Sequence, residues 1–314
     1  MDPNLLYWKN QGQSFFGRLR IWFNLLDPTS LSATDVEIKK AHALLGGEDP
    51  LNKEDGHALS LSLTSVHGDS GETLPLVFRP PALLPMAAPL VIASLLPHSS
   101  VKPALFWQFL LQSYSAGFNH ANGNSSSEQR KKTSLKQLLL LAGTVSYATC
   151  AGALPQIFIN RLGIRSASVQ TIFRSILPIP LSAALAFFNV FTIRSEESET
   201  GIRVFDRDGN PVGLSKAAGQ KAVKETALSR AALLGTTAAV PNILVLLLKR
   251  WRLFQRNPLL VAPLRHISVA FVFGLMIPVS FSLFPQLGTI KKEHVEEELK
   301  AAAVDGQLYY NRGL

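Results

Sequence analysis

Five uncharged polar side chains recur along the segment that ends at Asn122. Successive members are separated by four, three, four and three residues, which places them on one face of a helix. Amides and hydroxyls could bind the ammonium and carboxylate groups of a zwitterion without placing a fixed charge in a membrane. Two more amides, Asn189 and Asn242, lie within apolar stretches. The sequence therefore offers a candidate substrate site made of Gln108, Gln112, Ser115, Asn119, Asn122 and Asn189.

The same stripe has two structural interpretations. The amides could hold neighbouring helices together through hydrogen bonds, each worth about 0.6 kcal/mol and at most about 1–2 kcal/mol in a membrane. Alternatively, the polar face could lie in water beside the bilayer. The spacing by itself does not decide between substrate binding and these two roles.

Apolar stretches dominate the rest of the chain. Hydrophobic residues make up 47% of the 314 residues and charged residues only 17%, against about 25% charged residues in a typical soluble domain. Five stretches have about 17–25 residues with few or no charges, the length that a helix needs to cross a bilayer. We therefore expect an all-α membrane protein with about five transmembrane helices. These helices are predicted at Leu83–Val101, Leu138–Asn160, Thr171–Ile193, Leu228–Leu248 and Val261–Pro285.

Prolines occur within or at the ends of these stretches. Each one removes a backbone donor and kinks a helix, and in lipid the carbonyl that loses its partner has to be covered by protein or by a water-lined cavity. Several spans are therefore predicted to be kinked, as in a transporter or a tightly packed bundle. The prolines concerned are Pro85, Pro89 and Pro97 in the first span, and Pro155, Pro178, Pro180, Pro241, Pro278 and Pro285 in the others.

The polar N-terminal region reads as a set of short helices. Gly12–Asn24 is amphipathic, aromatic and basic, and is expected to rest either on a membrane surface or on the other helices of the region. Thr34 and Glu37 have the spacing of a capping box, in which each side chain bonds a free backbone N–H. We expect a helix from this box to Leu45 and another at Glu54–Val66.

A small hairpin is predicted between the third and fourth spans. Its strands are Ile202–Phe205 and Pro211–Gly213, around a turn that contains Gly209 and Asn210. Near the end of the chain, an acidic helix with a solvated face is expected at Lys291–Ala303. The chain thus divides into an N-terminal helical region at 1–82, a five-span domain at 83–285 and a C-terminal tail at 286–314.

Metal, cofactor and catalytic chemistry find no support in the sequence. The single cysteine, Cys150, excludes an internal disulfide and a cysteine-based metal site. The histidines form no i,i+4 pair and do not join carboxylates at ligand spacing. Phosphate-binding loops, dinucleotide fingerprints and nucleophile elbows are missing as well. We expect no enzyme activity, no bound metal and no cofactor.

The formal net charge of +9 would suit either nucleic acid or an anionic membrane surface. Two basic runs flank predicted spans, where attraction to anionic lipid head groups explains them more simply. We therefore expect a lipid bilayer as the partner of these runs, and no nucleic acid. The residues expected to contact head groups are Arg130, Lys131, Lys132, Lys249, Arg250 and Arg252.

Several motifs resemble those of the sideroflexins, in the same order and over nearly the whole chain. They include a Phe-Trp-Gln segment followed by Gln-Ser and two asparagines, a Gly-rich hairpin segment, and an aromatic-Asn-Arg-Gly-Leu ending. In this sequence the motifs are Leu105–Phe109, Gln112-Ser113, Asn119, Asn122, Gly201–Gly213, Phe284-Pro285-Gln286 and Tyr309–Leu314.

The resemblance implies a multi-pass protein of the mitochondrial inner membrane. It implies five spans, an N-terminus in the matrix, a C-terminus in the intermembrane space, and carriage of serine or other small neutral amino acids. With five spans, the basic loops Arg161–Gln170 and Lys249–Leu260 would share the N-terminal face. Lysine and arginine counts are nearly matched between the two faces, so charge alone does not orient the chain.

Three segments depart from the transporting sideroflexins. His67–Ser70 replaces His-Pro-Asp-Thr, Ser115-Ala116 replaces Asn-Ala, and Asn189–Phe191 replaces Asn-Ile-Pro. The departures resemble the divergent fourth subtype, which is linked to respiratory complex I assembly and to iron and iron–sulfur homeostasis. Two functions follow as alternatives. One is a transporter of small neutral amino acids or related solutes that is not a typical serine carrier, and the other is a membrane scaffold that binds complex I assembly factors.

Overall fold

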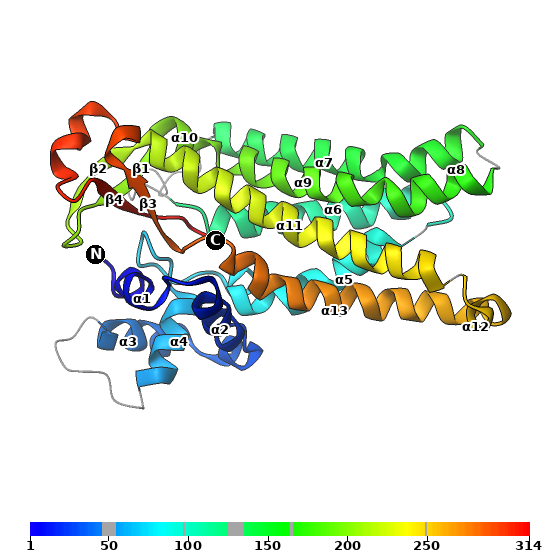
Figure 1. Ribbon diagram of the computed structural model, residues 1–314, viewed down its shortest axis with the longest axis horizontal. Coiled ribbons are helices and arrows are strands. Elements are labelled where there is room, and N and C mark those ends of the chain that lie inside the picture. The colour runs from blue at the N-terminus through cyan, green and yellow to red at the C-terminus, as the bar shows by residue number, and fades with distance from the viewer. Residues whose placement is uncertain (46–54, 97, 125–134, 164–165, 249) are drawn as a thin grey trace.

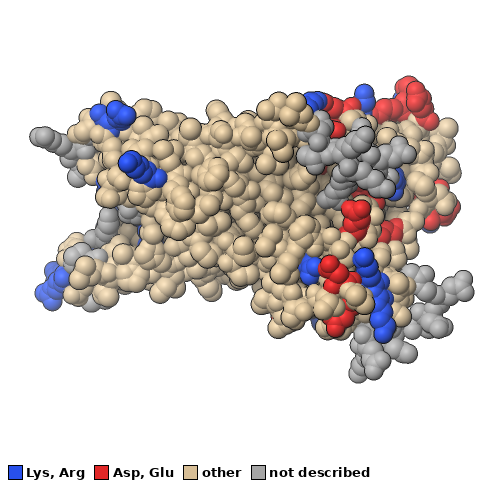
Figure 2. All heavy atoms as spheres, turned by 180° about the vertical axis from the view of Figure 1, so that it is seen from behind, with Lys and Arg blue, Asp and Glu red and all other residues tan. Residues whose placement is uncertain are grey.

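The computed structural model describes residues 1–45, 55–96, 98–124, 135–163, 166–248 and 250–314. Its longest helices lie side by side in one bundle (Figure 1). On the face seen in Figure 2, charged side chains gather at the two ends of the bundle and a belt without them lies between, as contact with lipid requires. Within the described ranges, four helical segments are long and apolar enough to cross a membrane, and each overlaps a predicted span. They are α7 (Leu135–Arg161), Ser168–Ile193, α11 (Lys216–Leu248) and α13 (Val261–Ser282).

The segment Ser168–Ile193 is not one regular helix. It consists of α8 (Ala167–Thr171), a π-helical turn at Ile172–Ile176 and α9 (Pro178–Ile193). In the π turn, the amide of Leu177 donates to the carbonyl of Ile172 at 2.9 Å. Pro178 lacks an amide hydrogen, so a helix start at this position leaves no donor unpaired. The break predicted from the prolines is therefore present in this span.

The first predicted span is wrong in its extent. α5 (Leu83–Leu95) has only 13 residues, which at 1.5 Å per residue reach about 20 Å rather than the ~30 Å of a bilayer core. It ends because Leu96 is extended, with φ −72° and ψ 146°, the conformation favoured for a residue that precedes a proline. The chain then enters α6 (Val101–Ala121), which carries the polar stripe.

Four short helices cover one end of the bundle. They are α1 (Pro3–Gln11), α2 (Phe15–Leu25), α3 (Asp35–Leu45) and α4 (Asp55–Ser65). The predicted capping box is confirmed: the amide of Thr34 donates to Glu37 Oε2 at 2.8 Å, and the amide of Glu37 donates to Thr34 Oγ1 at 3.4 Å.

Of the two positions expected for the aromatic helix, the structure shows packing on other helices. Trp22 of α2 stacks on Trp8 of α1, with ring centroids 5.3 Å apart, and meets Phe281 of α13 edge-on at 4.8 Å. These rings belong to a hydrophobic core shared by the N-terminal helices and the bundle. Two other aromatic residues of α2, Phe16 and Phe23, stay exposed.

The predicted hairpin is confirmed and is part of a larger sheet. Strands β1 (Ile202–Phe205) and β2 (Pro211–Ser215) pair antiparallel. Two further strands from the end of the chain, β3 (Leu287–Lys291) and β4 (Gln307–Asn311), complete the strand order β2-β1-β4-β3. The sheet lies at the same end of the bundle as α1–α4, and α10 (Ser195–Thr200) connects α9 to it (Figure 1).

The helix predicted at Lys291–Ala303 is wrong. The segment forms two 3₁₀ turns, Lys292–His294 and Glu297–Ala302, between β3 and β4. Its apolar side chains pack in a small core against β1, β4 and α11. Glu296, expected on a solvated face, accepts hydrogen bonds from the amides of Lys216 and Ala217 at 2.7 and 3.1 Å. The carboxylate thus caps the N-terminus of α11, where unpaired amides favour a negative charge.

The N-terminal and C-terminal regions pack on one another, which contradicts the expectation that they lie on opposite sides of the membrane. Lys9 of α1 donates to the carbonyl of Arg207, and its ammonium lies 5.2 Å from the ring centre of Tyr309 in β4. Leu5 and Leu314 belong to one hydrophobic core. α8 and α12 (Arg252–Arg256), which belong to the two basic loops, lie at the other end (Figure 1). The basic loops therefore do not share a face with the N-terminus.

Candidate functional site

The polar stripe forms one buried face of α6, as its spacing predicted. Gln108, Gln112 and Asn119 are buried, and Ser115 is half-buried. The opposite face of the helix carries the exposed rings of Phe106 and Phe109. α6 thus turns aromatic side chains outward and amides inward, so the interpretation in which the stripe faces water beside the bilayer is wrong.

Hydrogen bonds connect these amides to another residue of the candidate set, Asn189 of α9. Asn119 Nδ2 donates to Asn189 Oδ1 at 2.9 Å. Asn189 Nδ2 donates to Gln112 Oε1 at 3.4 Å, and Gln112 Nε2 donates to Gln108 Oε1 at 3.4 Å. The amides therefore form a continuous chain along the contact between α6 and α9.

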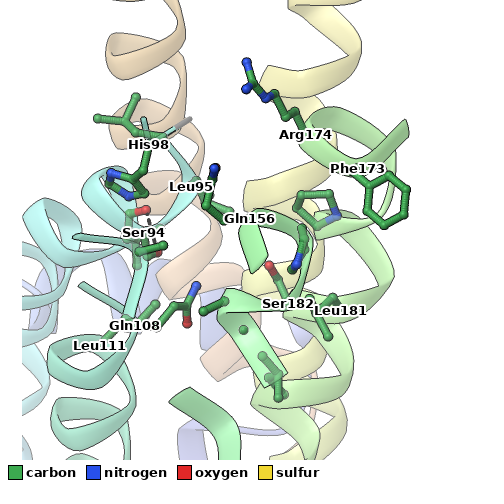
Figure 3. A pocket seen from close by; sticks show the side chains of 18 of the residues that line it. Ser94, Leu95, His98, Gln108, Leu111, Gln156, Phe173, Arg174, Leu181 and Ser182 are labelled. Atoms are coloured by element: carbon green, nitrogen blue, oxygen red, sulfur yellow. Dashed lines mark hydrogen bonds between the residues drawn. The ribbon is translucent and has the colours of Figure 1, made fainter. Parts of the chain in front are cut away.

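A cavity of about 80 Å³, named the outer cavity here, begins at this chain. Polar side chains from α5, α6, α7 and α9 line it, with His98 and Arg174 toward one end and Gln108, Gln156 and Ser182 deeper (Figure 3). A buried water needs about 10–15 Å³ of such volume, so the cavity has room for several waters or one small solute.

Gly152 of α7 makes room for the amide of Gln108. A Cβ atom at position 152 would lie 2.6 Å from Gln108 Cδ, closer than atoms of this kind approach. Gly152 lines the outer cavity beside Gln108. The absence of a side chain thus shapes the site, a role that composition and spacing did not indicate.

A second cavity of about 40 Å³, the inner cavity, adjoins the first. Gln112 lines both, and Ser115, Asn119 and Asn189 line the inner one. Arg230 of α11 also lines the inner cavity. Arg230 was not among the residues predicted for the site, although a charged residue inside a predicted span, here Leu228–Leu248, is a signal of function.

Asn122 and Asn242 do not reach these cavities. Asn122 follows the last residue of α6, and its Nδ2 donates to the carbonyls of Phe78 and Phe118 at 2.9 and 3.0 Å. Asn242 accepts a hydrogen bond from Arg265 of α13. Both amides hold helices in place, so the stripe combines residues of the candidate site with residues that stabilise the bundle.

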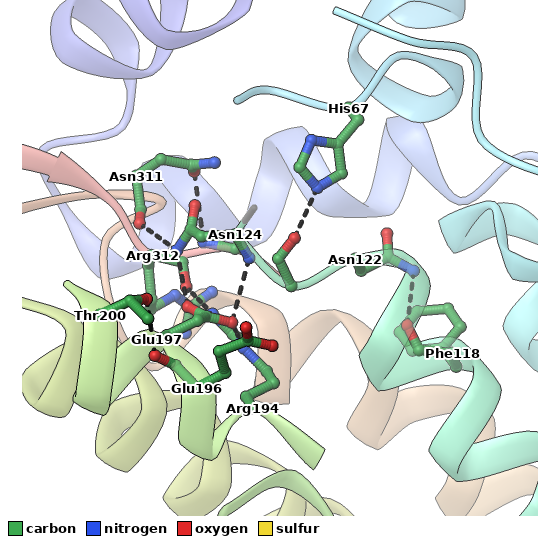
Figure 4. Close-up of polar contacts among 12 residues, drawn as sticks. His67, Phe118, Asn122, Asn124, Arg194, Glu196, Glu197, Thr200, Asn311 and Arg312 are labelled. Carbon is green, nitrogen blue, oxygen red and sulfur yellow. Dashed lines mark hydrogen bonds and ion pairs between the residues drawn. The ribbon is translucent and has the colours of Figure 1, made fainter. Parts of the chain in front are cut away.

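A buried polar cluster closes the end of the bundle beyond Asn122 (Figure 4). Arg194 pairs with Glu197 at 2.5 and 2.8 Å and donates to the carbonyl of Arg312 at 2.7 Å. Asn124 Nδ2 donates to Glu197 at 3.0 Å, and the amide of Leu314 donates to the carbonyl of Asn122 at 3.1 Å. These contacts tie the end of the chain to α6 and α9.

The surroundings at this end of the bundle lower the pKa of one side chain and fix the tautomer of another. Desolvation is the main cause that lowers the pKa of Arg312 to about 10, and the cations Arg194 and Arg18 act in the same direction. His67 Nδ1 accepts the amides of Asp69 and Ser70 at 3.3 and 3.2 Å. Its Nε2 therefore carries the proton and donates to the carbonyl of Gly123 at 2.7 Å. The divergent His67–Ser70 motif is thus part of this closure.

The predicted head-group residues are described only in part. Arg250 and Arg252 are exposed at the end of the bundle that also holds α8. The other candidates, Arg130, Lys131, Lys132 and Lys249, lie outside the described residues. In the part of the chain that the structure describes, no group of three or more His, Cys, Asp or Glu side chains could hold a metal ion.

Comparisons with known proteins support the family resemblance. The family model described as Sideroflexins matches residues 4–314. The chain is 53% identical over 317 residues to sideroflexin-4 of Danio rerio, with 100% of both chains covered. It is 34% identical over 320 residues to sideroflexin-4 of Homo sapiens, with 100% of this chain and 93% of the human protein covered. It is 30% identical over 311 residues to human sideroflexin-5, with 97% of this chain and 91% of that protein covered. No solved structure matches the chain.

Proposed function

The chain belongs to the sideroflexin family, and we propose that it is a multi-pass carrier of small neutral amino acids or related solutes in the mitochondrial inner membrane. One observation supports this proposal most strongly. The buried amides Gln108, Gln112, Asn119 and Asn189 line two adjoining cavities inside a bundle of apolar helices. Intramembrane polar groups that face a cavity are typical of substrate pathways.

The structure fits one state of an alternating-access cycle. The outer cavity lies among the ends of helices near the connection from α5 to α6, and includes Leu96 and His98. The opposite end is closed by the cluster around Arg194 and Glu197. We propose that solute enters from the end that holds α8 and α12, and that the π turn at Ile172–Ile176 bends when the bundle opens at the other end.

α6 completes the membrane domain in this proposal. Its 21 residues reach about 31 Å at 1.5 Å per residue, and its exposed rings suit lipid. The short α5 packs beside α6 and α13 without crossing the core by itself. With the pass that α5 makes between the two ends of the bundle, α6 and the four apolar segments bring the number of passes to six. An even number agrees with the contact between the N-terminal and C-terminal regions.

The solute differs from that of a typical serine carrier. Ser115 lines the inner cavity, and it stands where the resembling segment of transporting sideroflexins has asparagine. A shorter side chain that offers one hydroxyl instead of an amide changes both the room and the hydrogen bonds available to the solute. We therefore propose a related neutral solute rather than serine itself.

A scaffold for complex I assembly factors is the second candidate. The exposed rings of Phe16 and Phe23, 78% and 53% accessible, favour it because they lie on the surface of the N-terminal helices. Aromatic side chains of this kind often anchor protein interfaces. In this alternative, the amide chain would serve only to hold α6 against α9.

Uptake of labelled neutral amino acids into liposomes separates the two functions. The purified protein should give saturable uptake, and the Gln112→Leu, Asn119→Leu double variant should lose it while keeping its fold. A Phe16→Ser, Phe23→Ser variant serves as the matched control, because it changes the proposed docking surface and leaves the cavities intact. Absence of uptake by folded wild-type protein, together with partner loss in the control variant, would favour the scaffold.

A further inference from the structure

Arg230 is held deep in the bundle with part of its guanidinium unused. The side chain is only 7% accessible. It lies between two aromatic rings, 4.7 Å from the centre of Phe281 and 5.6 Å from the centre of Phe118. Nη1 donates to Ser280 Oγ at a long 3.4 Å, and Nη2 is buried without a hydrogen-bond partner among the described residues. The rings orient the guanidinium by cation–π contact but leave Nη2 free to donate.

No carboxylate of the described chain neutralises Arg230. The buried Glu197 is bonded to Arg194 and Asn124. Glu225 accepts from Tyr310 at 3.1 Å and lies 3.9 Å from Lys221. A guanidinium stays protonated in proteins, and an unpaired buried charge is costly. We therefore expect an anion from outside the chain to neutralise the charge of Arg230.

The same cavity offers an unused acceptor. Asn119 and Arg230 both line the inner cavity, and Asn119 Oδ1 is buried without a donor from any described residue. The orientation of this amide follows from the chain of hydrogen bonds, since Asn119 Nδ2 donates to Asn189 and Asn189 donates to Gln112. One cavity is thus lined both by a residue with an unused acceptor and by a residue with an unused cationic donor.

From these two unpaired groups we propose that Arg230 is the carboxylate-binding residue of the solute site, with Asn119 Oδ1 receiving the ammonium group. The inference deepens the proposed carrier function and rests on it, because it names the groups by which that site recognises its solute. Arg230 donates hydrogen bonds to the carboxylate from Nη2, and the rings of Phe118 and Phe281 exclude water from the pair. A neutral α-amino acid satisfies both groups, whereas an amine or a carboxylic acid satisfies only one.

Binding to the purified protein in lipid nanodiscs tests the inference without requiring transport. The probes are glycine, L-alanine and L-serine, the amides of these three amino acids, and propionate. The tightest amino acid should bind about 10–100-fold better than its amide, the loss expected for one charge-assisted hydrogen bond. Arg230→Gln should remove this difference in affinity. Asn119→Ala should weaken binding of the amino acid and leave binding of propionate unchanged.

Control variants separate ligand binding from packing. Arg265→Gln removes a matched cation from α13, outside both cavities, and should keep the preference for the acid. Ser280→Ala removes the hydrogen bond that Arg230 Nη1 donates within the described part of the chain, and it should also keep the preference for the acid. If Arg230→Gln fails to fold, the comparison of acids with amides on the wild-type protein decides whether the site recognises a carboxylate. Equal affinity for acid and amide, or no binding of any probe, would overturn the inference.

Failure of this inference and failure of the carrier function have different signatures. Discrimination against amides without uptake into liposomes would support the carboxylate site and reject carriage. Uptake that persists in a folded Arg230→Gln variant would support carriage and reject the role of Arg230.

Discussion

Asn119 Nδ2 donates to Asn189 Oδ1 at 2.9 Å, and this hydrogen bond joins α6 to α9 beside the inner cavity. The two residues are separated by 70 positions in the chain and are 3% and 1% accessible. The bond stabilises this helix contact and orients the Asn119 amide. Among the described residues, the oxygen of that amide, Asn119 Oδ1, is buried without a donor.

We predict that Asn119 and Asn189 are energetically coupled. Asn119→Leu leaves Asn189 Oδ1 buried without its donor, and Asn189→Leu leaves Asn119 Nδ2 buried without its acceptor. Either change should lower the free energy of unfolding by about 1–3 kcal/mol. The double variant should cost less than the sum of the two, because the bond between positions 119 and 189 is lost only once and neither of its partners is left unpaired. Unfolding in mixed micelles measures all three. Asn242→Leu, which breaks a bond to Arg265 instead, should be additive with Asn119→Leu.

Local patterns predicted the parts of this site that lie on one helix. The 3–4 spacing from Gln108 to Asn119 identified the inner face of α6, since spacing determines the face of a helix irrespective of its neighbours. It could not show that Asn122 leaves the cavities to bond the carbonyl of Phe78, because that depends on how the next helix ends. Nor could it pair Asn119 with Asn189, a contact set by the packing of α6 on α9.

The wrong prediction of a helix at Lys291–Ala303 has a similar cause. Val295, Leu299 and Ala303 are spaced like one face of a helix, and all three are buried. Their partners are the strands β1 and β4, and pairing of β4 with β1 joins residues about a hundred positions apart. Sequence periodicity carries no information on such pairing. The short hairpin, by contrast, was predictable because its turn and both strands are neighbours in the sequence.

Gly152→Ala should impair the outer cavity. The new methyl group would lie 2.6 Å from Gln108 Cδ, so the amide of Gln108 has to move or the contact between α6 and α7 has to loosen. Since this amide is the far end of a flexible side chain, it can turn away at little cost in stability, and we expect solute uptake to fall because the amide leaves its place in the cavity. Gly143→Ala on the same helix is the matched control, because a Cβ atom there would meet no packing neighbour within 4 Å among the described residues. Equal behaviour of the two variants would argue against a role for Gly152.

Protonation of Glu296 at low pH should weaken the contact between the β3–β4 connection and the N-terminus of α11. Partial burial disfavours the charged form of this carboxyl, but hydrogen bonds from Ser215 and from the amides of Ala217 and Lys216 prevail and lower its pKa below the ordinary 4.5. A carboxyl with a lowered pKa contributes stability above its ordinary pKa, and this stability is lost as the pH falls through the lowered value. Glu296→Gln should therefore flatten the loss of thermal stability below about pH 4.5. Glu298→Gln, a change at an exposed acid of the same segment, should leave the acid profile unaltered.

The buried pair of Arg194 and Glu197 should hold the closed end of the bundle. Their side chains are 1% and 7% accessible, and loss of one partner leaves the other charge buried, at a cost of about 3–5 kcal/mol. Arg194→Met also frees the carbonyl of Arg312. Hydrogen exchange in the peptide 307–314 should then accelerate, because the amides of Arg312 and Leu314 are protected by bonds to Gln286 and Asn122 in this closure.

An exposed ion pair provides the control for that experiment. Lys136 and Glu199 are 73% and 58% accessible, and exposed pairs contribute only about 0–1 kcal/mol. Lys136→Met should therefore leave exchange in 307–314 unchanged.

The double variant Arg194→Met, Glu197→Met should recover much of the lost stability, since a buried pair replaced by apolar side chains is often neutral or better. Its exchange at Leu314 should stay fast, because the bond from position 194 to the Arg312 carbonyl is still missing. Slow exchange in the double variant would show that packing, rather than this bond, closes the end of the bundle.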